Sequence, residues 1–117
     1  MTAAHLTLTI EQGADFEHVL IVQDATGQEV NLTGYRARMH IRPTAGHGTL
    51  LHELTTDEGG GIHIDGPTGT LTLSIPATVT ATFTWRSAEY DVLLIAPDGK
   101  RYRLVKGPIN VDPAVTT

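Results

Sequence analysis

The sequence predicts one all-β domain, a sandwich or small barrel of about eight short strands. Three observations predict it. Apolar and polar residues alternate in several segments, turn signals recur about every 8–12 residues, and eighteen threonines favour strands over helices. A length of 117 residues and an apolar content of 40% suit a single packed domain over 1–117, with short flexible ends at about 1–4 and 112–117. Since only six residues are aromatic, aliphatic side chains must form most of the core.

The first two strands are predicted at residues 6–10 and 16–24. Leu6, Leu8 and Ile10 alternate with threonines, which is the pattern of a strand with one buried face. Residues 19–22 are apolar on both faces and predict a strand that is deep in a sheet or covered on two sides. Residues 25–28 predict a turn.

The most regular alternation covers residues 35–42, where one face is apolar and the other is basic. Gly34, just before this strand, can supply a positive φ for the preceding corner without steric cost. The predicted core side holds Tyr35, Ala37, Met39 and Ile41, and the solvent side holds Arg36, Arg38, His40 and Arg42.

The second half of the chain predicts further strands at residues 50–55, 62–64 and 70–75, then one short helical turn at about 76–83 that begins with Pro76. A strand at 89–96 follows, with Tyr90, Val92 and Leu94 on one face. Pro97-Asp98-Gly99-Lys100 is a strong reverse-turn sequence, and residues 101–105 and 108–111 complete the last hairpin.

Net charge and composition argue against several functional classes. A formal charge of −5 does not favour binding to a phosphate backbone, and without cysteine there is no disulfide or thiolate site. No basic, apolar leader and no membrane-length apolar run is present in the sequence. We therefore expect neither nucleic acid nor membrane as a partner.

The candidates for chemistry are weak. Ser74 and Ser87 do not lie in a nucleophile motif. His52, His63 and Asp65 could meet around a metal if their strands paired, and Asp57, Glu58 and Asp65 could offer oxygen ligands to calcium, but neither set has a ligand motif. We expect surface and turn roles for these residues, and no catalytic residue, cofactor or metal.

The arginines are the strongest local feature. Arg36, Arg38 and Arg42 form a basic stripe in an acidic protein, and Arg101 and Arg103 could join it. Such a stripe is often only a solvated strand face. Alternatively, guanidinium groups on a rigid sheet can pair with carboxylates of a neighbouring subunit, since arginine is enriched at interfaces.

Two segments carry a resemblance to small virion proteins of tailed phages. Residues 24–42 (DATGQEVNLTGYRARMHIR) resemble the start of baseplate upper proteins and tail-fibre amino-terminal domains, and residues 89–111 (EYDVLLIAPDGKRYRLVKGPINV) resemble their closing hairpin. The sequence departs from them at residues 28–31, where those proteins often have Pro and Asp. The resemblance implies an immunoglobulin-like sandwich and a structural role in the virion.

We therefore expect a non-enzymatic phage structural protein, an adaptor or connector of the tail, baseplate or fibre attachment. It would be assembled in the host cytoplasm, bind other virion proteins and form a homo-oligomer, with a trimer as the expected state. One alternative is a capsid decoration protein. Another is a carbohydrate-binding module that stacks sugars on Trp85, Tyr35, Tyr90 and Tyr102.

Overall fold

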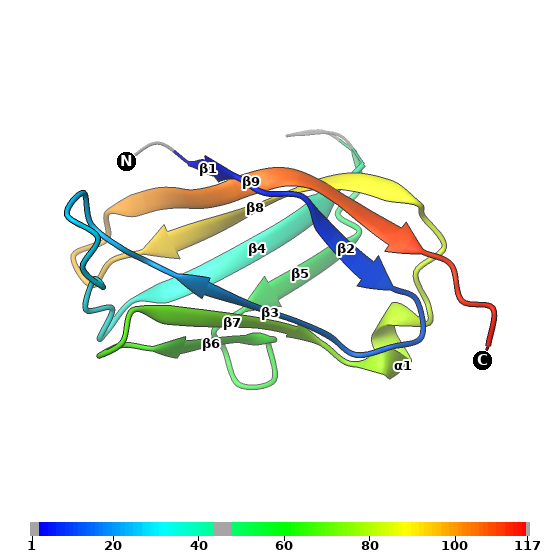
Figure 1. Ribbon diagram of the computed structural model, residues 1–117, viewed down its shortest axis with the longest axis horizontal. Coiled ribbons are helices and arrows are strands. Elements are labelled where there is room, and N and C mark those ends of the chain that lie inside the picture. The colour runs from blue at the N-terminus through cyan, green and yellow to red at the C-terminus, as the bar shows by residue number, and fades with distance from the viewer. Residues whose placement is uncertain (1–2, 44–47, 117) are drawn as a thin grey trace.

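The computed structural model describes residues 3–43 and 48–116, which form two sheets packed face to face and one helical turn (Figure 1). This architecture confirms the predicted all-β sandwich. The elements are β1 Ala4–His5, β2 Leu8–Glu11, β3 Phe16–Ile21, β4 Arg36–Arg42, β5 His52–Thr55, β6 Ile62–Asp65, β7 Thr70–Ile75, α1 Ala77–Thr80, β8 Ser87–Ile95 and β9 Arg101–Asp112.

The strand order is that of an immunoglobulin-like sandwich. The larger sheet runs β1-β9-β8-β4-β5, with β2 also paired to β9, and the smaller sheet runs β3-β7-β6. These sheets correspond to the A′GFCC′ and BED sheets of the immunoglobulin fold. The strands β1 and β2 pair with β9 in parallel, whereas the other strand pairs are antiparallel.

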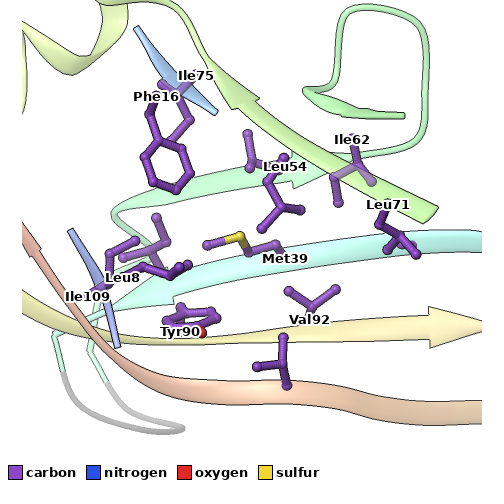
Figure 2. Packing of buried hydrophobic residues seen from close by; sticks show 14 of the residues in the cluster. Leu8, Phe16, Met39, Leu54, Ile62, Leu71, Ile75, Tyr90, Val92 and Ile109 are labelled. Atoms are coloured by element: carbon purple, nitrogen blue, oxygen red, sulfur yellow. The ribbon is translucent and has the colours of Figure 1, made fainter. Parts of the chain in front are cut away.

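The core lies between the sheets and is built from alternating residues of each strand. On β4, Ala37, Met39 and Ile41 are buried, as their alternation predicts, and Met39 is paired in register with Val92 of β8. From the smaller sheet, Leu71 and Ile75 of β7 pack into the same cluster (Figure 2).

The last strand differs from the prediction because residues 101–105 and 108–111 form one continuous strand, β9. Gly107 and Pro108 lie inside it, opposite the interval between β1 and β2. A Cβ atom on Gly107 would overlap the Leu6 carbonyl oxygen, so this close approach requires glycine. The Leu6 carbonyl accepts a 2.7 Å hydrogen bond from the Tyr90 hydroxyl.

Polar side chains hold the crossing from β2 to β3 against α1. The hydroxyl of Thr80, which is fully buried, donates to the Ala14 carbonyl at 2.8 Å and accepts from the Gly13 amide at 3.1 Å. Asp15 Oδ1 accepts from the Ala77 amide at 2.7 Å and so caps the helical turn. The predicted turn is present, with Pro76 at the N-cap position.

The strand β3 is not covered on two sides, contrary to its two-sided apolar pattern. It is an edge of the smaller sheet, with β7 as its neighbour in the sheet. Val19 and Ile21 are 51% and 60% exposed. Their side chains lie on the outer face of the sheet, because Phe16 on the opposite face of the strand is buried.

The Tyr90–Leu6 bond yields a stability prediction. Changing Tyr90 to Phe leaves the Leu6 carbonyl without its hydroxyl donor, so we expect the free energy of unfolding to fall by about 1–2 kcal/mol. Urea unfolding monitored by circular dichroism measures this change. Tyr102→Phe is the matched control, because no partner of its hydroxyl is found among the described residues. Equal losses in both variants would contradict the assigned role of the bond.

Candidate functional site

Four of the five predicted arginines gather at one end of the larger sheet, on its outer face. Arg36 and Arg101 flank Ile95 of β8 in register, and Arg38 and Arg103 flank Leu93. Directly paired residues point to the same side of a sheet, and strands two apart lie roughly 10 Å from each other. We call Arg36, Arg38, Arg101 and Arg103 the arginine cluster.

A tight turn and a bulge aim the arginines of β9. In the β8–β9 turn, the Gly99 amide donates to the Ala96 carbonyl at 2.9 Å, and Asp98 Oδ1 accepts from the Lys100 amide at 3.0 Å. The pairing register shifts between Val92 and Leu93, so Leu104 is an extra residue opposite them. This bulge reverses the alternation along β9, with Arg103 exposed before it and Val105 buried after it.

The arginine cluster has an excess of positive charge. Arg103 Nε lies 2.9 Å from Asp91 Oδ2, in an ion pair exposed to solvent. Arg36, Arg38 and Arg101 form no ion pair with the residues that the structure describes. Four guanidinium groups and one carboxylate leave a local charge of about +3 (four minus one) on this part of the sheet.

The cluster also has an apolar centre. Ile95 is only 8% exposed although it lies outside the main core cluster. Its register neighbours are Arg36 and Arg101, and the aliphatic stems of arginine can cover such a residue while their charged ends remain in water. Leu93, between Arg38 and Arg103, is half-buried. The surface thus combines cations with apolar area.

Arg42, the fifth predicted arginine, lies apart from the cluster at the other end of β4. Its Nη1 donates to the Gly48 carbonyl at 3.1 Å, and its Nη2 lies 3.5 Å from His40 Nδ1. His40 Nε2 is 2.7 Å from Glu53 Oε2. Arg42 is therefore engaged within its own chain and lies outside the arginine cluster, although it lines the same hollow as Arg103.

A broad hollow of about 630 Å³ lies between Arg42 and the β1–β9 edge. Gly107 and Pro108 form part of its wall, and neither has a long side chain that would fill the space. Cations and carboxylates both line it, and Asp91 pairs there with Arg103. The lining is His5, His40, Arg42, Glu89, Tyr90, Asp91, Arg103, Lys106, Gly107 and Pro108. Of the arginine cluster, only Arg103 lines this hollow.

Charge is divided between the two sheets. All eight lysines and arginines lie in residues 36–42 and 86–106, so β3, β6 and β7 of the smaller sheet contain none. Glu17 lies on β3 and Asp65 on β6, and Asp57 and Glu58 precede β6. The strands of the larger sheet therefore carry both cations and carboxylates, whereas the charged residues on the strands of the smaller sheet are only carboxylates.

The candidate metal ligands remain separate. His52 lies on β5 of the larger sheet, whereas His63 and Asp65 lie on β6 of the smaller sheet. In residues 3–43 and 48–116, no three side chains of the metal-binding types come together. Asp57 and Glu58 line a small hollow with His63, and Asp65 is not part of its wall.

The remaining polar and aromatic candidates also do not form a common site. Ser74 lies in the smaller sheet and Ser87 in the larger one. Tyr90 is buried, and Trp85 is half-buried with its ring 5.2 Å from that of Phe83. Tyr102 pairs with Leu94 near the end of β8, whereas Trp85 precedes the start of that strand, so these two rings are not neighbours on one surface.

No protein-family model and no curated protein sequence matches the chain. Within the described part of the chain, no helix is long and apolar enough to cross a membrane.

The sequence did not predict the exposed surface formed by Val19 and Ile21. The apolar pattern of their strand is typical of a strand that is covered on both faces.

The environment of His52 yields a pH prediction. Its ring lies 5.4 Å from the Phe83 ring, and burial lowers the pKa of His52 despite the opposing charge of Glu53. The unfolded chain therefore binds the proton more readily, and stability is lost as the pH falls below about 6.5.

We expect the urea midpoint to fall between about pH 7.5 and about pH 5.5, and the fall to be smaller in His52→Gln. Exposed His63→Gln is the control and should follow the wild type. An unchanged pH dependence in His52→Gln would show that this histidine does not cause it.

Proposed function

We propose that this chain is a non-enzymatic bacteriophage structural protein, an adaptor or connector of the tail, baseplate or fibre attachment. The phage assignment draws on the resemblance of residues 24–42 and 89–111 to baseplate and fibre domains. The observation that carries the protein-binding role is the arginine cluster on a rigid sheet. Its partner is then another virion protein or another copy of the chain.

The geometry of the arginine cluster supports a protein contact. Its backbone is held in register by β8, which pairs with both β4 and β9, so the guanidinium groups start from fixed positions. Arg36, Arg38 and Arg101 have no carboxylate partner within the described residues. Arginine binds planar carboxylates in a bidentate manner, and the half-buried Leu93 adds apolar contact surface.

The proposed function predicts that the chain is part of purified phage particles. Quantitative mass spectrometry should find it at tens of copies or fewer for each particle, relative to the major capsid protein. Hundreds of copies would instead support a capsid decoration protein. Its absence from particles of the phage that encodes it would contradict both.

The arginine cluster predicts that Arg36→Glu/Arg38→Glu protein loses incorporation into particles, because the change places negative charges where carboxylates of the partner should bind. Phage complementation followed by quantification of the chain in purified particles measures this loss. Arg86→Glu/Lys106→Glu is the control with the same change in net charge outside the cluster. Equal incorporation of wild type and Arg36→Glu/Arg38→Glu, with the fold intact by circular dichroism, would remove the cluster as the contact.

A further inference from the structure

We propose that the arginine cluster of one copy binds the outer face of the smaller sheet of a second copy, in a head-to-tail contact. We call the receiving surface the acidic–apolar face and define it by Glu17, Val19, Ile21 and Asp65. The inference rests on the proposed role of the cluster in protein contacts, and it names a second copy of this chain as a partner.

The first observation is the uncovered apolar surface on β3. Val19 and Ile21 are two of the four large hydrophobic side chains that are exposed in the described residues. They are paired in register with Thr72 and Thr70 of β7, which are uncharged. The sequence of β3 is that of a strand covered on both sides, and the single chain covers only one. A partner surface would bury the other side.

The second observation is charge complementarity. Glu17 of β3 and Asp65 of β6 lie on the same outer face, because Val19 and His63 both pair with Thr72 of the intervening strand. Neither acid forms an ion pair with the described residues, and the three strands of this sheet contain no lysine or arginine. The surface, which also holds His63, therefore offers carboxylates with no lysine or arginine of its own.

Each surface repels a copy of itself and attracts the other. Two acidic–apolar faces brought together would oppose carboxylates to carboxylates, and two arginine clusters would oppose cations to cations. When the two different surfaces meet, arginines face Glu17 and Asp65. Leu93, at the centre of the arginine cluster, then meets the apolar pair on β3. Both the charges and the apolar residues of the two surfaces are therefore complementary.

The positions of the two surfaces determine the type of assembly. They lie on the outer faces of different sheets, and thus on opposite sides of the sandwich (Figure 1). A contact between unlike surfaces builds an open stack or, if the rotation closes, a ring. Opposite surfaces favour a stack or a wide ring over the trimer expected from the sequence, which needs surfaces on adjoining sides.

The contact is small. Three strands of up to six residues give the smaller sheet an outer face of roughly 300 Å². Stable interfaces bury roughly 800 Å² on each partner, so we expect weak, concentration-dependent association.

The test uses the full chain and two variants, one for each surface. Sedimentation equilibrium should show a wild-type mass that rises with concentration. Arg36→Glu/Arg38→Glu and Val19→Ser/Ile21→Ser should each remain monomeric, since each lacks one of the two surfaces. An equimolar mixture of the two variants should form a heterodimer, because the intact cluster of one can bind the intact face of the other.

Two controls separate surface effects from general ones. Arg86→Glu/Lys106→Glu matches the charge change of the first variant, and Val115→Ser removes the fully exposed Val115 side chain at another site. Both should associate like the wild type. Circular dichroism establishes that every variant is folded.

Three results would overturn the inference: a wild type that stays monomeric up to millimolar concentration, a mixture of variants that stays monomeric, or loss of association in the β3 variant alone. The last result would indicate symmetric pairing of two β3 edges instead. A monomeric chain that is still incorporated into particles overturns only the head-to-tail contact. A chain that associates but is absent from particles overturns only the proposed function.

Discussion

The alternation of side chains along β4, β8 and β9 is the constraint on which the core and the candidate site both depend. The same register that buries Met39 against Val92 places Arg38 beside Leu93 on the outer face. A slip of one residue would exchange the two faces and bring arginines into the core. The hydrophobic core and the basic surface are therefore two results of one pairing.

Local sequence patterns correctly predicted the elements whose structure is determined by residues close together in the chain. The alternation of 35–42, the strand at 70–75 and the Pro97–Lys100 turn are present as expected, and Gly34 has the positive φ proposed for it. The prediction for β3 was wrong because an apolar strand pattern does not say which strand lies beside it. The sequence pattern divided β9 into two strands because Gly and Pro, here Gly107 and Pro108, commonly mark turns. Glycine is required at this position because the carbonyl oxygen of Leu6, from a distant part of the chain, lies against it.

The candidate site was predicted only in part, because it too depends on which strands and loops lie side by side. A period of two indicates which face a residue lies on, so the arginines of β4 could be assigned to the solvent side. Whether Arg101 and Arg103 join them depends on the bulge at Leu104, which no residue type announces. The separation of Arg42 depends on Gly48, and that of His52 from His63 on a change of sheet. These positions are determined by the pairing and connection of the strands, and not by the local sequence pattern.

The parallel pairing of β2 with β9 has a mechanical consequence. Four residue pairs join these strands, from Leu8 with Ile109 to Glu11 with Asp112. Tension that pulls the start of β2 and the end of β9 apart acts along both strands, so their hydrogen bonds are loaded together in shear and not opened one by one. The sandwich is thus built to resist stretching along this axis, with the rupture force shared by the whole ladder.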